Sequence, residues 1–273
     1  MRRLMNIAPS RTSSLLLGLL PLAAILVLYI AASIARLAAN PTDKLLPSFA
    51  AMGDVLNRYA LHADPRTGEV LLWSDTFASL ERLALGLGLA TLIGLVVGIA
   101  LGVIPLVRAG LGTVVAIIAV VPPMAILPIL FIVFGLGETS KVALIVIGVT
   151  PFLIRDLAIQ GQALPIEQNV KAQSLGASSW QYIIRVALPQ LLPRLIEGVR
   201  LSLGPAWLFL IAAEAIAAEN GLGYRIFLVR RYLAMDVIIP YVAWIALIAF
   251  SSDLALAALS RKAFPWAHLK DAR

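Results

Sequence analysis

The chain of 273 residues is 60% hydrophobic and only 14% charged, with a mean hydropathy of +0.93. A soluble domain carries about 45–50% apolar and about 25% charged residues, so this composition predicts a membrane protein. The sequence has no cysteine, which excludes disulfides, thiolate metal sites and cysteine nucleophiles, and its two histidines, His62 and His268, are too far apart to suggest a metal site. The net charge of +7 is explained by basic residues beside membrane spans and does not require a nucleic-acid partner.

Six apolar stretches are long enough to cross a bilayer, which takes about 20 residues. They are roughly 15–36, 83–107, 111–135, 141–160, 195–217 and 237–259. The first is too long for the core of a signal peptide and lacks a clear cleavage site, so we expect a retained anchor. The polar stretch 40–79 fits a small extramembrane cap or an amphipathic helix. The pattern therefore predicts an all-α membrane protein with six transmembrane helices.

Basic residues indicate the orientation. Twelve lysines and arginines fall on the side that holds both termini and the loop between the fourth and fifth spans, and nine fall on the other side. The side richer in Lys and Arg is expected to face the cytoplasm. The chain then divides into a cytoplasmic N-terminus (1–14), a first transmembrane helix (15–36), a periplasmic segment (37–82), a five-helix core (83–260) with a cytoplasmic loop at about 161–193, and a cytoplasmic tail (261–273).

The second span contains small residues at strict four-residue spacing: Gly86, Ala90, Gly94, Gly98 and Gly102. Residues four apart share one helix face, so these five form a smooth ridge. Such ridges let two helix backbones approach closely in lipid. We expect this face to pack against another helix, although glycine is also common in membrane helices in general.

The third span is interrupted by prolines at 122, 123 and 128. Proline removes a backbone hydrogen bond and clashes with the preceding turn, so the helix should be kinked or broken. Broken backbone at membrane depth is tolerated where it is buried in protein or lines a watery cavity. Pro123, Met124 and Pro128 are therefore candidates for a translocation path, and a purely structural kink is the alternative.

Ionisable residues inside the spans are expensive in lipid and usually functional. Glu214 in the fifth span and Asp253 in the sixth are candidates that either pair with a neighbour or line the path. Arg155 and Asp156, at the end of the fourth span, fit side chains that extend to the membrane interface.

Enzyme motifs are missing from the sequence. It contains no glycine-lysine dipeptide and hence no phosphate loop, and neither H-E-x-x-H nor G-x-S-x-G occurs. The string GLGETSK at 135–141 joins two spans and reads as an external turn. We therefore expect this chain to hydrolyse no ATP and to bind no cofactor of its own.

The loop between the fourth and fifth spans has a helical pattern that Gly176 interrupts, and Ser178 or Ser179 can cap the helix that follows. The pattern predicts a short helix, a turn and a second helix on the cytoplasmic face. Exposed Leu175, Ala177 and Trp180 would suit a docking knob for another protein. An ordinary amphipathic interfacial helix is the alternative.

This loop resembles the EAA motif of binding-protein-dependent ABC importer permeases, in which E-A-A is followed after three residues by G and after nine more by I-x-L-P. Ala172, Gly176, Leu188 and Pro189 match the motif, while Lys171 replaces its glutamate and Gln173 its second alanine. The nitrate/sulfonate/taurine branch is similar over further segments: LLPS (45–48), PPMAILPILFIVFGLGETSK (122–141), AAEAIAAENGLGY (212–224) and FPW (264–266).

The resemblance implies a type I (MetI-like) importer permease in the bacterial inner membrane. Two permease copies, expected as a homodimer, would sit on two ABC ATPase subunits that carry the ATP and Mg. The loop would be the coupling helix, with Lys171, Ala172, Leu175, Gly176, Ala177, Leu188 and Pro189 contacting the ATPase. A periplasmic binding protein would deliver a small anionic solute, which alternating access would carry inward.

Arg225, Arg230 and Arg231 are expected on the outer face, where they suit docking of the binding protein better than substrate selection. An ion-gradient-driven secondary transporter is the alternative function, but it predicts inverted repeats that the sequence lacks. A membrane scaffold that only anchors an ATPase is a third possibility.

Overall fold

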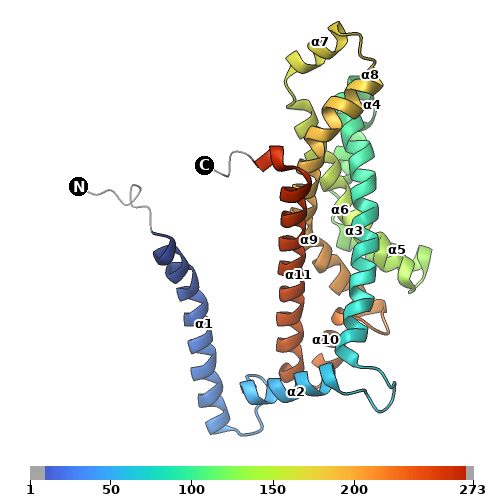
Figure 1. The fold of residues 1–273 in the computed structure, drawn as a ribbon. Helices are drawn as coiled ribbons and strands as arrows, with labels where there is room; N and C mark the ends of the chain where they lie inside the picture. Colours follow the sequence, from blue (N-terminus) through green and yellow to red (C-terminus); the bar gives the residue numbers. More distant parts are fainter. Residues whose placement is uncertain (1–9, 269–273) are drawn as a thin grey trace.

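The computed structural model describes residues 10–268, and the regular elements within this range are all helices (Figure 1). Residues 1–9 and 269–273, which belong to the predicted cytoplasmic termini, lie outside it. Five helical segments are long and apolar enough to cross a membrane: α1 (Arg11–Ala39), α3 (Leu71–Val103), α6 (Glu138–Gln162), α8 with α9 (Ser179–Ala217) and α11 (Met235–Ala263). The pair α4 (Pro105–Ile118) and α5 (Pro123–Phe134), bent by 92°, is long and apolar enough to be a sixth span with a break. The all-α prediction is confirmed, and the described residues hold five candidate spans, or the predicted six if the bent pair is one span.

Short helices mark the two ends of the bundle (Figure 1). The α10 end carries α2 (Phe49–Leu61) and α10 (Leu222–Arg230), and the α7 end carries α7 (Ile166–Ser174) and α8 (Ser179–Tyr182). In Figure 1, α1 begins and α11 finishes on the side of the α7 end. This arrangement agrees with the prediction that both termini share a side with the loop between the fourth and fifth spans, while the side that faces the cytoplasm stays a prediction.

Two helix boundaries differ from the sequence prediction. The second span was expected to begin at residue 83, but α3 begins at Leu71, so the predicted extramembrane segment 37–82 loses its last twelve residues to this helix. The difference arises because a hydropathy average leaves polar residues out of a predicted span even when other helices of the bundle supply their hydrogen-bond partners. The expected third span, 111–135, is two helices that begin at Pro105 and Pro123, because proline is favoured at the first helical position and cannot continue a helix.

The predicted ridge of small residues is the contact surface between α3 and α6. A Cβ added to Gly86 would lie 2.7 Å from Ile145, one on Gly94 2.8 Å from Leu153, and one on Gly98 2.9 Å from Leu157. The partner is always 59 positions further along the chain, so the two helices run parallel and in fixed register. Gly102 meets Gly161 in the same register, and all five ridge residues are buried. The packing face is confirmed.

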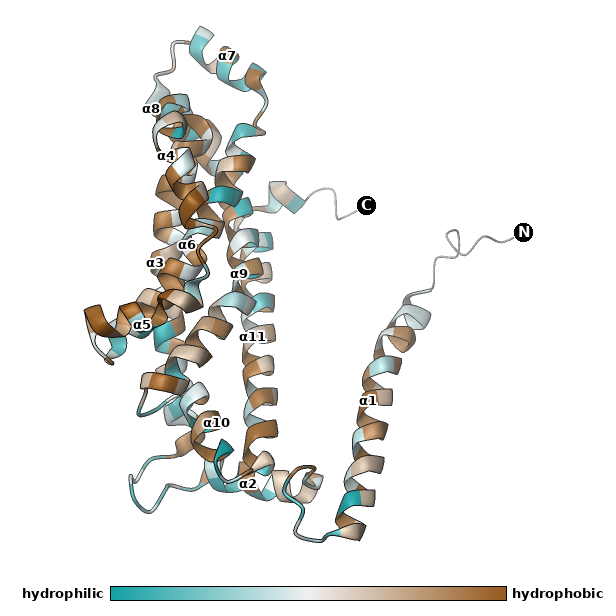
Figure 2. Cartoon of the chain, turned by 180° about the vertical axis from the view of Figure 1, so that it is seen from behind, coloured by the Kyte–Doolittle hydropathy of each residue, from teal (hydrophilic) through white to brown (hydrophobic). Residues whose placement is uncertain are grey.

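Helix α1 stands apart from the bundle and touches it only near the α10 end (Figure 1). There Tyr29 and Ser33 donate hydrogen bonds to the carbonyls of Pro47 (2.7 Å) and Leu46 (2.9 Å). The rest of α1 is an exposed apolar surface. In Figure 2 the spans are largely brown, the colour of hydrophobic residues, whereas α7 is mostly hydrophilic teal. Lipid or another protein chain must therefore cover α1.

Candidate functional site

The α7–α8 knob, defined as residues 166–182, protrudes beyond the bundle (Figure 1). Helix α7 ends at Ser174, a turn follows, and α8 begins at Ser179. The predicted arrangement of a short helix, a turn and a second helix is confirmed.

The turn of the knob is a Schellman motif, which explains why glycine is found there. The N–H of Ala177 bonds to the carbonyl of Ala172 (3.0 Å), and the N–H of Gly176 bonds to that of Gln173 (2.9 Å). Gly176 has φ +79°, the left-handed conformation that glycine adopts without steric cost. The spacing of the family motif at Ala172 and Gly176 therefore encodes a helix end.

The second helix of the knob is fixed by a capping box. Ser178 Oγ accepts the N–H of Gln181 (3.2 Å), and Gln181 Oε1 accepts the N–H of Ser178 (2.8 Å). With the glycine turn, this cap makes the knob a defined shape rather than a loose loop. Ser178, one of the two predicted caps, is the one that the structure uses.

Large apolar side chains project from the knob. Leu175 is 80% exposed and Trp180 is 68% exposed, and Lys171 next to them is also exposed. Ala172 and Ala177 lie partly buried beneath the turn. An apolar surface rimmed by polar residues typically marks a protein contact.

The knob is linked to the long helix α9 (Leu188–Ala217). Residues Ile183–Ala187 form a single turn of π-helix between α8 and α9, followed by half-buried Leu188 and Pro189. Gln190 in α9 donates to Gln168 of α7 (2.9 Å) and to the carbonyl of Val186 (2.8 Å). The knob is thus in direct contact with a membrane-spanning helix.

The broken span lies beside a cavity. Residues 119–122 connect α4 to α5, and Pro123 lines a cavity of about 560 Å³ together with side chains of α6 and α9. Pro128 lies inside α5, and Met124 is exposed. The structure therefore places one of the three predicted path residues, Pro123, on a cavity, and the role of all three stays a prediction.

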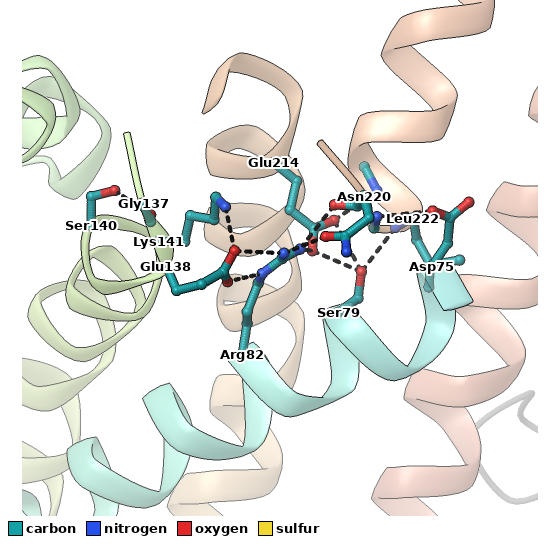
Figure 3. Close-up of polar contacts among 12 residues, drawn as sticks. Asp75, Ser79, Arg82, Gly137, Glu138, Ser140, Lys141, Glu214, Asn220 and Leu222 are labelled. Atoms are coloured by element: carbon teal, nitrogen blue, oxygen red, sulfur yellow. Dashed lines mark hydrogen bonds and ion pairs between the residues drawn. The ribbon is translucent and has the colours of Figure 1, made fainter. Parts of the chain in front are cut away.

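Glu214 is fully buried and belongs to a polar network at the α10 end (Figure 3). Its carboxylate accepts hydrogen bonds from Ser79 (2.8 Å) and Arg82 (2.8 Å) of α3. Arg82 also bonds Glu138 of α6 (2.9 Å between Nη2 and Oε1), which in turn accepts from Lys141 (2.8 Å). Of the two alternatives for Glu214, the structure favours pairing with a neighbour.

The turn before α10 folds onto this network. The N–H groups of Gly221, Leu222 and Gly223 donate to Asp75, Ser79 and Glu214 at 2.8–2.9 Å (Figure 3). They are unpaired donors at the start of a helix, and carboxylates are favourable partners there. Gly221 has φ +118°, and a Cβ there would lie 2.6 Å from the Glu214 carboxyl group, so only glycine fits.

The three arginines predicted to dock a binding protein lie in different surroundings. Arg225 bonds Asp75 of α3 (2.7 Å) and is only 14% exposed at its side chain, whereas Arg230 and Arg231 are exposed. Asp253, the second carboxylate predicted in the path, pairs with Arg200 at 2.8 and 2.9 Å and is part-exposed rather than deeply buried. Docking and path roles for these residues stay predictions.

Sequence reasoning missed Asp75, Ser79 and Arg82, which were assigned to the polar segment outside the membrane. Their spacing of four and three residues is that of one helix face. That signal, read together with the buried acid of the fifth span, points to a helix that extends past the apolar stretch.

A bundle of long apolar helices with a break beside a cavity and a structured knob at one end is the architecture of a membrane-spanning transporter subunit. The chain belongs to the family described as "Binding-protein-dependent transport system inner membrane component", which matches residues 90–264. This family consists of permeases of ABC importers. The resemblance of this chain to the nitrate/sulfonate/taurine branch is confirmed by its relatives.

The taurine transport system permease protein TauC of Escherichia coli (strain K12) is 43% identical over 202 residues, covering 72% of each chain. The putative aliphatic sulfonates transport permease protein SsuC of the same organism is 35% identical over 157 residues, which cover 56% of this chain and 59% of the relative. The nitrate import permease protein NrtB of Synechococcus elongatus is 35% identical over 148 residues, 54% of this chain and 53% of the relative.

Solved structures show the same fold. The MetNI methionine ABC transporter in an inward-facing conformation has a TM-score of 0.57 at 21% identity, covering 69% of this chain and 95% of the solved chain. An amino acid ABC transporter crystallised with histidines gives a TM-score of 0.56 at 17% identity, covering 78% and 96%. The predicted type I, MetI-like permease fold is confirmed.

Proposed function

We propose that this permease imports a small solute with an anionic oxygen group, of the taurine, sulfonate or nitrate type, from the periplasm to the cytoplasm. The proposal is supported by three relatives whose names specify taurine, aliphatic sulfonates and nitrate. These solutes share a small size and a delocalised anionic group. Transport would proceed by alternating access, driven by ATP and Mg on separate ATPase subunits.

The α7–α8 knob is the observation that carries the coupling part of the proposal. An exposed Leu175 and Trp180 on a fixed turn can insert into a cleft of an ATPase subunit, and the link from Gln168 to Gln190 passes motion to α9. Counted back from Gly176, the motif's glutamate falls at Val170 and its first alanine at Lys171, one position earlier than the assignment made from the sequence. Lys171 therefore adds a positive charge within the motif, and the partner ATPase should present an acidic or neutral group opposite it.

A second copy of this chain is the partner that we propose inside the membrane. Exposed apolar side chains cover α1 and the face of α5 that carries Ile129, Ile132 and Val133. Two copies on two ATPases would enclose the path between them, with both termini in the cytoplasm. The α10 end would then face the periplasm, where Arg230 and Arg231 are available to a binding protein.

The ion-gradient-driven alternative is less well supported by the local chemistry. A carboxylate that exchanges protons or ions must be free to change partners, but Glu214 is held by three donors and Asp253 by two hydrogen bonds to Arg200. The scaffold alternative does not account for the broken span beside a cavity.

The test is ATP-dependent uptake by the permease reconstituted with its ATPase subunits and binding protein, comparing Gly176→Trp with Gly68→Trp. Both glycines have positive φ and open space around them, and Gly68 lies outside the knob, before α3. We expect the Gly176 variant to lose ATPase association and uptake, and the Gly68 variant to keep both. If both activities survive at Gly176, the coupling role of the knob is wrong; uptake that follows an ion gradient without ATP would favour the secondary transporter.

A further inference from the structure

A pair of opposite charges lines the cavity beside the broken span. Arg155 and Asp156 of α6 contribute to its wall, together with Pro123 from the break and Phe209 of α9. Its volume of about 560 Å³ is within the range of sites for small molecules, roughly 300–1,000 Å³. Arg155 lies seven residues before the end of α6, about 10 Å along the helix.

Three arginines of the spans, unlike these two residues, have partners within the bundle. Arg82 is bonded by Glu214, Arg200 by Asp253, and Arg108 by the carbonyls of Leu101 and Gly102. Within residues 10–268, neither Arg155 nor Asp156 forms a hydrogen bond or an ion pair, although they are adjacent in sequence. The charged groups that act electrostatically on Asp156 are Arg194 and Glu197 of α9, and these two form an ion pair with each other at 2.9 Å.

An unpaired charge within a membrane helix is expensive, so it usually has a function. Extension to the interface would account for Arg155 alone. It does not account for an unpaired carboxylate lining the same cavity. Two free charges of opposite sign on one wall are complementary to a ligand that carries both signs.

We propose that this cavity is a transient substrate site for a small zwitterion, an aminoalkanesulfonate, in which Arg155 binds the sulfonate and Asp156 binds the ammonium group. A guanidinium presents a planar fork of donors that suits an oxyanion, and a carboxylate accepts from an ammonium. The apolar remainder of the wall, including Ile126 and Ile147, suits the short carbon linker. The inference rests on the proposed function and specifies the ligand within it.

The shape of the cavity depends on a close contact between α6 and α9. A Cβ on Gly148 would lie 2.3 Å from the ring of Phe209, so the ring occupies the space that a side chain at position 148 would need. Any residue larger than glycine there must push Phe209 aside, and Phe209 itself lines the cavity. The distance between α6, which carries the two charges, and α9 is therefore fixed by the contact of Gly148 with Phe209.

The experiment exploits the absence of cysteine from the sequence. Phe152→Cys places a single thiol on the cavity wall, one helical turn from Arg155. The assembled permease–ATPase complex, without binding protein, is treated with a small thiol reagent in the presence of taurine or of ethanesulfonate, which lacks the ammonium group. The quantity measured is the rate of thiol modification.

We expect taurine to slow modification several-fold. Adding Arg155→Gln should raise the concentration of either compound that gives half-maximal protection by about tenfold or more, the usual effect of losing a charged hydrogen bond. Adding Asp156→Asn should weaken protection by taurine but not by ethanesulfonate. Lys262→Gln, which removes an exposed charge near the end of α11, is the matched control and should change neither.

The inference is overturned if neither compound protects the thiol, or if both protect equally well in the Arg155→Gln and Asp156→Asn backgrounds. If Arg155→Gln fails to assemble, Arg155→Lys keeps the charge, and it should retain weakened protection by both compounds. ATP-driven taurine uptake by the unaltered complex is measured in parallel, so that the cavity site and the proposed substrate are tested separately. Uptake without protection of the thiol refutes the cavity site alone. Absence of uptake refutes taurine as the substrate.

Discussion

Arg82 and Glu214 are 132 positions apart in the chain, yet their side chains form a buried ion pair of 2.8 Å that joins α3 to α9. The same carboxylate accepts from Ser79 and from the N–H of Gly223, so it also holds the start of α10. Three segments are thereby fixed at the α10 end of a bundle whose remaining contacts are largely apolar. These bonds specify the geometry of this end, so loss of the Glu214 carboxylate should destabilise the packing of all three segments.

Glu214→Gln should destabilise the protein by about 1.5–3 kcal/mol, because Arg82 loses a buried charged hydrogen bond and keeps only its bonds to Glu138 and Asn220. Glu197→Gln is the matched control, since it breaks an exposed ion pair with Arg194 that is worth less than about 1 kcal/mol. Thermal unfolding of the two variants in detergent is the measurement. Equal losses in the two variants would show that the buried pair contributes no more than a surface pair.

The ridge of α3 offers a second comparison on one helix. Gly98→Leu should disrupt the contact with α6, because even a Cβ would lie 2.9 Å from Leu157 and the helices would have to separate. Overpacking of this kind costs about 1–3 kcal/mol or more. Gly88→Leu, with nothing within 4 Å of the added Cβ, should fold normally. The yield of monodisperse protein after extraction reports both, and a normal yield for Gly98→Leu would contradict the ridge packing.

Features that depend on local spacing were predictable from the sequence. The ridge follows from a four-residue repeat, and the knob follows from Gly176 followed by a serine cap. In the structure each ridge glycine of α3 meets the residue of α6 that lies 59 positions later, and no local pattern contains that register. Local rules therefore specify the surface of a helix but not its partner.

The polar network at the α10 end was not predictable in the same way. Asp75, Ser79 and Arg82 lower the mean hydropathy of the first turns of α3, so the apolar stretch starts at residue 83 in a sequence window. Their cost in a membrane protein is removed by Glu214, Glu138 and Arg225, which come from three other helices. Only the tertiary arrangement shows that these charges cancel.

Leu175→Asp on the knob should weaken binding of the ATPase subunit by about tenfold or more, since a buried apolar anchor at an interface is commonly worth over 1 kcal/mol. The control is Leu61→Asp, because Leu61 is 73% exposed and lies at the end of α2, far from the knob (Figure 1). Co-purification of the tagged permease with the ATPase subunit gives the readout. Comparable retention of the ATPase by both variants would place the contact elsewhere on the permease.

The orientation of the chain can be decided with single cysteines, because the sequence has none of its own. Gln173 on the knob and Thr67 before α3 are both exposed, and they lie near opposite ends of the bundle. If the α7 end faces the cytoplasm, a thiol reagent that cannot cross the inner membrane should label Thr67→Cys in intact cells with a permeable outer membrane. It should label Gln173→Cys only after the inner membrane is disrupted. The charge count that predicts this orientation has a margin of only three residues, so labelling of Gln173→Cys in intact cells would reverse the topology and remove the knob from the reach of any cytoplasmic ATPase.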